Sequence, residues 1–371
     1  MTRRMRAWRL TAVLVPFAIV AAGCAAEVEP STTTSSTTRV TSLSTTTTAE
    51  VQTLVPELDA ATSAPGAPRV AVTGDIACDP AHASFNGGLG TGTVCRQLYT
   101  SDIVVNGGFD AALLLGDTQY ECGGAAAFQQ SYDISWGRVK SITRPSPGRH
   151  EYLTSGGTDC PTTSGTADPY FDYFNGVGNF TGPAGDRDKG YYSFDLGAWH
   201  IIALNSVCGP AGGCESGSPQ EVWLANDLAA STKFCSVAYM HSPRWSTAQE
   251  LGNPDLADLY QTLYDGGVDV ILAAHVHSYQ RFAPQNPQAD LDNAFGIRQF
   301  IVGTGGKNVR LGDFIPGVPN WEVWEDDTFG VLSLTLNPGS YDWEFIPEAG
   351  QTFTDTGSQA CHAPPGDEAS S

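Results

Sequence analysis

Four short apolar runs of the chain are each followed closely by a residue that can bind a metal ion. These residues are Asp75, Asp117, His241 and His275, and the runs before them suit buried strands. A single Asp after Gly usually belongs to a turn, and a single buried His is usually a hydrogen-bonded core residue. Ligands in open α/β sheets gather beyond the carboxyl ends of the strands. Because several independent runs end in the same way, the pattern predicts a metal site at these ends.

The elements that must position these residues alternate between strands and helices. Apolar runs predict strands at 69–73, 111–115, 199–204, 236–240, 268–273 and 299–302. Ser218 and Glu221 form a capping box that begins one helix. Asn253 begins the next helix, which ends before Gly266. This alternation predicts an α/β domain, and the sequence shows no internal repeat or second domain.

The histidines divide into two groups. Four of the seven belong to the predicted metal region, and these are His150, His241, His275 and His277. His82 and His362 fall in expected loops. His200 lies inside an expected strand, where a structural role is the simpler interpretation.

Five motifs in order resemble those of the calcineurin-like metallophosphoesterases. They are Gly74-Asp75, Gly116-Asp-Thr-Gln-Tyr120, Gly148-Arg-His-Glu151, Val237-Ala-Tyr-Met-His241 and Ala274-His-Val-His277. The tyrosine three residues after Asp117 narrows the resemblance to the purple acid phosphatase branch, in a bacterial and exported form. The resemblance covers roughly residues 67–347, and it implies a layered α/β sandwich of mixed β-sheets flanked by helices.

Carried over residue by residue, the resemblance implies two adjacent metal ions. The implied ligands of the first metal are Asp75, Asp117, Tyr120 and His277, and those of the second are Asp117, His241 and His275, with Asp117 bridging. Mixed imidazole and oxygen ligands suit iron, zinc or manganese rather than calcium. A phenolate from Tyr120 favours iron in the first site, with iron, zinc or manganese in the second. The alternative for Tyr120 is a buried aromatic residue near the site.

The reaction that the resemblance implies is hydrolysis of a small phosphate ester. Two close metals lower the pKa of a shared water to give hydroxide and hold the phosphoryl oxygens for in-line attack. His150 would then protonate the leaving oxygen or stabilise charge in the transition state. Monoesters, diesters and nucleotides stay open as substrates. A serine hydrolase is disfavoured because the sequence has no Gly-x-Ser-x-Gly elbow.

Arg149 departs from the family pattern, which has a metal-binding Asn at this position. A guanidinium has no acceptor atom and stays charged, so Arg149 cannot be a ligand. Either it turns away or grips a substrate phosphate, or the second metal is weak or missing and the chain is a degenerate binding protein. The fifth motif also differs, with Ala274 in place of Gly. We favour the active enzyme because the other ligand positions hold competent residues.

Residues 1–24 read as an export signal. A basic start precedes an apolar run from Leu10 to Ala22, which is too short to span a bilayer comfortably. The run ends in Ala21-Ala22-Gly23-Cys24, which resembles a bacterial lipobox with lipid attached to the sulfur of Cys24. The sequence therefore predicts a bacterial cell-surface lipoprotein that contacts the membrane only through its lipid. Ordinary secretion is the alternative.

The rest of the chain divides by composition. Residues 25–66 are a Ser/Thr-rich linker with too little apolar surface to fold, residues 67–348 the expected catalytic domain, and residues 349–371 a C-terminal tail. The eight cysteines after Cys24 suggest up to four disulfides in an exported chain. Their pairing stays open, although Cys208 and Cys214 are close enough to pair locally.

The overall charge narrows the class of partner. The chain has 19 Lys and Arg against 40 Asp and Glu, a net charge of -21. Nucleic acids are bound through basic patches, so the charge argues against a nucleic-acid partner. A phosphate ester held by metal ions is still compatible, because bound cations reverse the local charge. The oligomeric state is not fixed by the sequence.

Overall fold

The computed structural model describes residues 66–152, 156–160, 165–249 and 252–365. The expected export signal with Cys24 and nearly all of the expected linker lie outside these residues. Within the described part of the chain, none of the helices has the length and apolar character needed to cross a membrane.

One mixed sheet has six strands in the order β13-β12-β11-β1-β2-β3. The strands are β1 (Arg69–Thr73), β2 (Ala111–Leu115), β3 (Thr143–Ser146), β11 (Gly330–Asn337), β12 (Ser340–Pro347) and β13 (Thr356–Ala360). β1, β2 and β3 run parallel, and the other pairs are antiparallel. The strands expected at 69–73 and 111–115 are therefore confirmed.

The second mixed sheet has seven strands in the order β10-β8-β9-β7-β6-β5-β4. The strands are β4 (Tyr192–Leu196), β5 (Trp199–Ala203), β6 (Cys235–Tyr239), β7 (Val270–Ala273), β8 (Tyr279–Phe282), β9 (Arg298–Val302) and β10 (Trp321–Glu325). β5, β6, β7 and β9 are parallel neighbours. This parallel centre contains the four strands that the sequence predicts in this half of the chain.

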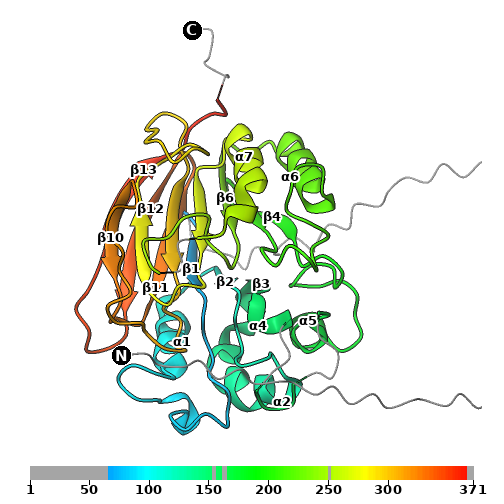
Figure 1. Cartoon of the computed structure of the whole chain (residues 1–371), viewed down its shortest axis with the longest axis vertical. Helices are drawn as coiled ribbons and strands as arrows, with labels where there is room; N and C mark the ends of the chain where they lie inside the picture. Colours follow the sequence, from blue (N-terminus) through cyan, green and yellow to red (C-terminus); the bar gives the residue numbers. More distant parts are fainter. Residues whose placement is uncertain (1–65, 153–155, 161–164, 250–251, 366–371) are drawn as a thin grey trace, which may run out of the picture. The chain divides into compact units, whose positions relative to one another are not determined.

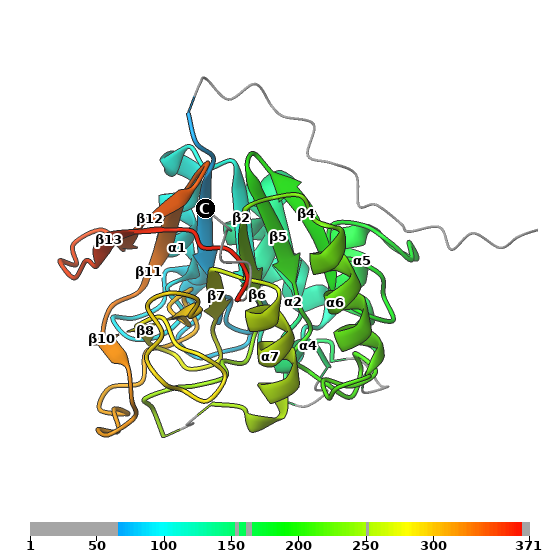
Figure 2. The same cartoon turned by 90° about the horizontal axis from the view of Figure 1, so that it is seen from above.

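Helices cover both outer faces of the paired sheets (Figures 1 and 2). The α-helices are α1 (Gln97–Gly107), α2 (Ala125–Ala127), α3 (Asp133–Ser135), α4 (Arg149–Tyr152), α5 (Asp168–Asn175), α6 (Pro219–Ala230) and α7 (Ala257–Asp265). Shorter turns are the 3-10 helices Asn86–Gly88, Trp136–Ile142 and Pro254–Leu256 and the π-helix Phe128–Tyr132.

The core follows the alternation of side chains along the strands. On β1, Val70 and Val72 belong to the cluster between the two sheets, and Ala71 belongs to the cluster beneath the helices. Successive residues of a strand point to opposite faces, so a strand buried on both faces reads as a continuous apolar run. Leu224 of α6 and Leu259 of α7 cover the second sheet in the same manner. The two sheets are thus packed face to face with helices outside.

The expected helix signals hold with small differences. Ser218 accepts a hydrogen bond from the backbone N–H of Glu221, while the Glu221 carboxylate accepts from Gly217 rather than from Ser218. Asn253 caps a 3-10 turn that leads into α7. Gly267, with φ of 72°, lies just beyond α7, where a left-handed residue commonly ends a helix.

The central part of the expected C-terminal tail, residues 356–360, forms strand β13. β13 pairs antiparallel with β12, for example Gly357 with Trp343. Cys361 forms a disulfide with Cys235 on β6. The sequence of β13, Thr-Gly-Ser-Gln-Ala, has no large apolar residue, and β13 is an edge strand with little burial, so no apolar pattern could reveal it.

All eight cysteines after Cys24 are paired. The disulfides are Cys78–Cys95, Cys122–Cys160, Cys208–Cys214 and Cys235–Cys361. Four disulfides confirm the upper number expected, and the short loop between Cys208 and Cys214 closes locally as expected.

Candidate metal centre

The four residues that sequence analysis places at strand ends all lie two positions beyond their strands. Asp75 follows β1, Asp117 follows β2, His241 follows β6 and His275 follows β7. Backbone bonds tie these turns together within and between the sheets. The N–H of Asp75 donates to the carbonyl of Gly116 at 3.2 Å, and the N–H of Gly74 donates to the carbonyl of Val302, at the end of β9, at 2.9 Å. The edges of the two sheets therefore meet at one place and bring the four side chains together.

Three of these turn residues have a left-handed backbone. The φ angles are 58° at Asp75, 46° at Asp117 and 69° at His275. Residues other than Gly adopt this region infrequently, and each instance costs on the order of 1 kcal/mol. Such conformations concentrate at functional sites, so their repetition here supports the assignment of this region as the site.

Three side chains converge on the hydroxyl of a fourth, Tyr120. Its Oη donates to Asp75 Oδ1 at 2.6 Å and lies 3.2 Å from both Asp117 Oδ2 and His277 Nε2. All four side chains are buried. Asp75 Oδ2 is buried and has no hydrogen-bond partner among the described residues. These four are the expected ligands of the first metal, and an unsatisfied buried carboxylate oxygen fits a bound cation.

The expected ligands of the second metal form a neighbouring cluster. One ligand atom each of Asp117, His241 and His275 lies within 4.8 Å of the others. His241 Nε2 is 3.1 Å from Asp117 Oδ2, yet among the described residues it has no partner in hydrogen-bond geometry. Asp117 Oδ2 thus faces His241 on one side and Tyr120 on the other, as a bridging ligand would.

Backbone carbonyls orient two of the histidines. His241 Nδ1 contacts the carbonyl of Leu115 at 2.9 Å, and His277 Nδ1 contacts the carbonyl of Asn308 at 3.0 Å. A carbonyl can only accept, so each Nδ1 carries a proton, and Nε2 of each ring is the atom directed at the cluster that could bind a metal. Metal-binding histidines are commonly fixed in this way.

The electrostatics of the cluster favour a cation. Burial alone would raise the pKa of Asp117, but His241 and His150 outweigh it and hold that pKa below its usual range. Burial would lower the pKa of His241, but Asp117 and Asp75 raise it to about 9. Burial, Asp117 and Asp75 raise the pKa of Tyr120 well above its ordinary value. Without a metal the site therefore holds protons that a metal would displace.

Glu151 is a site residue that sequence analysis noted only as the end of a motif. Its buried carboxylate accepts hydrogen bonds from the backbone N–H groups of Asp117 at 2.9 Å, Thr118 at 2.7 Å and Gly148 at 2.7 Å. Burial and the charge of Asp117 raise its pKa. Glu151 thus connects the turn at Asp117 to α4. The only sign of this role in the sequence is its place in the Gly148–Glu151 motif.

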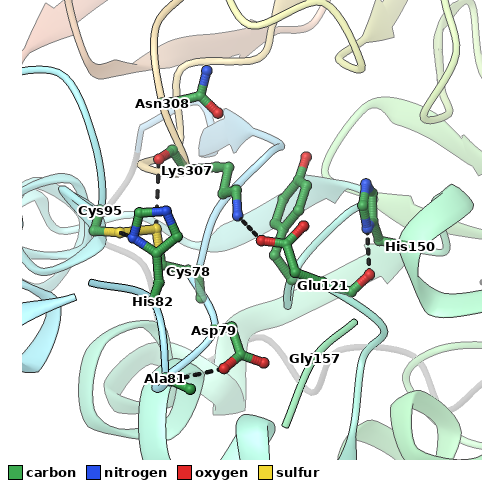
Figure 3. A network of polar contacts seen from close by, with 12 residues as sticks. Cys78, Asp79, Ala81, His82, Cys95, Glu121, His150, Gly157, Lys307 and Asn308 are labelled. Atoms are coloured by element: carbon green, nitrogen blue, oxygen red, sulfur yellow. Dashed lines mark hydrogen bonds and ion pairs between the residues drawn. A yellow bond between two sulfur atoms is a disulfide. The ribbon is translucent and has the colours of Figure 1, made fainter. Parts of the chain in front are cut away.

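His150 lies beside the cluster and is partly open to solvent. Its backbone N–H donates to Asp117 Oδ1 at 2.8 Å, and its Nε2 lies 3.9 Å from Asp117 Oδ2. Its Nδ1 contacts the backbone carbonyl of Glu121, as Figure 3 shows. The ring centroids of His150 and Tyr120 are 4.2 Å apart. A partly exposed imidazole here can reach a ligand bound at the cluster.

Arg149 lines a cavity of about 470 Å³ next to the second cluster. The other lining residues are Ser206, Val207, Cys208, Gly209, Ser242, Pro243, Gly252, Asn253, Asp255 and His275. Arg149 is exposed. The Arg149 side chain therefore lines the same cavity as the expected metal ligand His275.

Several curated proteins are similar to the chain in sequence. No protein-family model matches it. Purple acid phosphatase 21 of Arabidopsis thaliana is 35% identical over 128 residues, which cover 33% of this chain and 28% of that protein. Probable purple acid phosphatase 20 of the same plant is 27% identical over 281 residues, covering 72% and 61%. Human acid phosphatase type 7 is 24% identical over 302 residues, covering 74% and 63%. The chain thus spans less than two thirds of each of these relatives.

Solved structures show the same fold. Purple acid phosphatase PPD1 from yellow lupin superposes with a TM-score of 0.61 at 20% identity, covering 80% of this chain and 54% of that one. GAP50 of Plasmodium gives 0.55 at 13% identity, covering 81% and 90%. PhoD gives 0.53 at 14% identity, covering 81% and 71%. The expected fold class is confirmed. The chain has the fold of the purple acid phosphatases, and it is similar in sequence to several purple acid phosphatases.

Proposed function

We propose that this chain is a phosphoesterase that hydrolyses small phosphate esters at a site for two metal ions. The observation that carries the proposal is the position of Asp117 Oδ2, which lies 3.2 Å from Tyr120 Oη and 3.1 Å from His241 Nε2. A single carboxylate oxygen between two sets of ligand atoms is the arrangement that two metals sharing a bridge require.

The ligand assignment follows from the two clusters. Asp75, Asp117, Tyr120 and His277 would hold the first metal, and Asp117, His241 and His275 the second. Imidazole with carboxylate and phenol oxygens suits iron, zinc or manganese. When bound, two such ions would lower the pKa of a water molecule and neutralise charge on the phosphoryl oxygens.

His150 supplies the proton for the leaving group. Hydrolysis forms a bond from phosphorus to a water oxygen and breaks the bond to the ester oxygen. Because the Glu121 carbonyl accepts the Nδ1 proton of His150, the proton that passes to the departing oxygen is the Nε2 proton of the doubly protonated ring, which becomes neutral in the step. General acids of this kind contribute about 100-fold or more.

Arg149 is a candidate for binding the substrate phosphate, which is the alternative to its weakening the second metal. Its planar guanidinium can give two charge-assisted hydrogen bonds to phosphate oxygens, and it lines the cavity that also contains His275. The cavity of about 470 Å³ suits a small phosphate ester.

A second candidate function is phosphate-ligand binding without turnover. Arg149 favours it, because a permanent positive charge stands where a neutral metal ligand is expected. One relative, 26% identical over 259 residues that cover 61% of this chain and 39% of that protein, is named probable inactive purple acid phosphatase 1.

Metal reconstitution with a substrate panel separates the two functions. The purified chain is stripped with a chelator, reloaded with iron, zinc or manganese, and assayed on mono- and diesters. We expect turnover that disappears on stripping and returns with metal, and about a 100-fold loss of kcat in His150→Asn. The matched control is His82→Asn, a loop histidine outside the cluster. Phosphate binding without turnover under any metal would instead support the binding protein.

We also propose that the chain is exported and anchored by lipid on Cys24. The lipobox-like end of residues 1–24 supports this, as do four disulfides, which persist in oxidising compartments. In a bacterial host, Cys24→Ala should move the protein from the membrane fraction to the soluble exported fraction. Gly23→Ala keeps a small residue and should stay in the membrane fraction. Equal membrane association of all forms would contradict the anchor.

A further inference from the structure

Glu121 contacts Lys307 through its side chain and His150 through its backbone. Its carboxylate forms an ion pair with Lys307 Nζ, and its backbone carbonyl accepts from His150 Nδ1. Figure 3 shows Glu121 between these two partners, with Lys307 on one side and His150 on the other. Lys307 follows strand β9 in a turn, whereas His150 belongs to α4. The residue thus links segments that lie far apart in the sequence.

Lys307 is fixed in place from several directions. Only 10% of its side chain is exposed, so its charge requires a partner. Its Nζ lies 4.5 Å from the centroid of the Tyr120 ring, where the ring face attracts a cation. Its backbone N–H donates to the carbonyl of Asp75 at 2.9 Å, and its carbonyl accepts from Cys95 N–H at 3.0 Å. Lys307 is therefore a rigid support for Glu121.

The ring of His150 depends on Glu121 for its direction. Among the described residues, the Glu121 carbonyl is the hydrogen-bond acceptor recorded for the ring of His150. The side chain of His150 is 28% exposed, and its Nε2 lies 3.9 Å from Asp117 Oδ2. Its ring is tilted against that of Tyr120, with the two ring centroids 4.2 Å apart. A shift of the Glu121 backbone would let the ring turn on Tyr120 and move Nε2.

We propose that the Glu121–Lys307 ion pair is a positioning device for His150. By holding Glu121 against a buried cation, the pair fixes the carbonyl that sets the direction of the His150 ring. Nε2 is thereby aimed at the leaving oxygen. This inference rests on the proposed hydrolysis, in which the proton passes from His150 Nε2 to that oxygen as its bond to phosphorus breaks.

The leaving group provides a selective readout. An alkoxide is a strong base and leaves slowly unless it is protonated, whereas p-nitrophenolate leaves readily without a proton. Loss of His150 orientation should therefore slow hydrolysis of an alkyl phosphate more than that of p-nitrophenyl phosphate. A general loss of fold or metal would slow both substrates alike.

The decisive variants are Lys307→Met and Glu121→Gln, assayed on glycerol 2-phosphate and p-nitrophenyl phosphate. We expect kcat to fall about tenfold on the alkyl ester and less than about threefold on the aryl ester, with KM little changed. Lys307→Arg keeps the cation and should keep most of the rate. Metal content and thermal stability are measured for each variant, so that misfolding is recognised.

A matched control exists at Arg96. Arg96 forms an ion pair with Glu348 at 2.8 Å and lies 3.5 Å from the centroid of the Tyr99 ring. Arg96→Met therefore removes a buried ion pair and a cation over a tyrosine, without touching Glu121 or His150. We expect this variant to leave the ratio of the two substrate rates unchanged.

Two kinetic outcomes would overturn the inference. If kcat falls equally on both substrates in Lys307→Met, the Glu121–Lys307 ion pair has only a structural role. If KM rises while kcat is unchanged, Lys307 contacts the substrate. Crystal structures of the parent and of Lys307→Met add a test that needs no turnover. The ring of His150 should leave the Glu121 carbonyl in the variant, and an unmoved ring would refute positioning. An inactive parent would count against the proposed hydrolysis alone.

Discussion

The two halves of the candidate metal centre differ in what surrounds them. In the first half, Tyr120 Oη lies within 3.2 Å of three other buried ligand atoms. In the second half, Asp117, His241 and His275 gather within 4.8 Å, and His275 also borders the cavity that Arg149 lines. One half is closed by the protein, and the other opens to the space where a substrate would bind.

This difference shows where the chain can vary. In the buried half, each side chain is enclosed by the others. A charged replacement there would lower the stability of the fold, because the new charge would be buried without a partner. At the open half, an arginine can point into solvent or toward a substrate. We therefore expect the two metals to differ in affinity, with the first bound more tightly than the second.

The largest expected effect is that of Asp117→Asn, which removes the bridge between the halves. We expect kcat/KM for phosphate esters to fall by about 1,000-fold or more, because metal ions supply several kcal/mol of transition-state stabilisation. Asp227→Asn is the matched control, since Asp227 pairs with the structural His200 at 2.9 Å. Near-parent activity in Asp117→Asn would show that the halves do not share this residue.

Tyr120→Phe tests the closed half alone. If the first metal is ferric iron, the parent should show a visible charge-transfer band that this variant lacks completely, because the phenol oxygen is gone. Tyr132→Phe, another buried tyrosine, should keep the band. A band that survives in Tyr120→Phe would assign it to another group.

The pH dependence of metal binding tests the open half. His241, with a pKa of about 9 in the metal-free protein, holds a proton below that pH, and the metal needs the neutral ring. Affinity for the second metal should therefore fall as pH falls, by about 100-fold from pH 8 to pH 6. Titrations of stripped protein in two buffers should detect release of about one proton from His241. Affinity that does not change with pH would contradict this protonation state.

The smallest expected effect concerns Arg149. Arg149→Asn restores a neutral oxygen ligand and removes a charge near the second metal, so we expect about tenfold tighter binding there and higher activity. Arg149→Met removes only the charge and should give part of the gain. If Arg149 grips substrate phosphate instead, Arg149→Asn raises KM while metal affinity stays the same.

Sequence reasoning located the strand ends and the residues on them because both signals are local. The run Ala111–Leu115 is wholly apolar, and Gly116-Asp117 follows it directly, so the strand, its turn and the candidate ligand can be read together. At β1, β6 and β7, too, the candidate ligand lies two positions beyond a mainly apolar strand. The repeated pattern predicts that these residues share one site, but their placement on two sheets is not local and follows only from the family resemblance.

Contacts between distant segments explain what was missed. Lys307 pairs with Glu121 across 186 positions of the chain, and neither residue stands out by type or spacing. Glu151 is informative only once Asp117 and Gly148 are known to present their N–H groups to it. Strand β13 has no apolar pattern because it lies at a sheet edge. Each omission reflects tertiary structure that no local pattern encodes.

The metal content of the purified chain tests the central claim most directly. Elemental analysis of the reconstituted parent should find two metal ions per chain, and Asp117→Asn should lose metal from both halves, because one carboxylate oxygen serves both. His241→Ala should retain only the first metal. A parent that binds a single ion, or an Asp117→Asn variant that keeps two, would contradict the two-metal account.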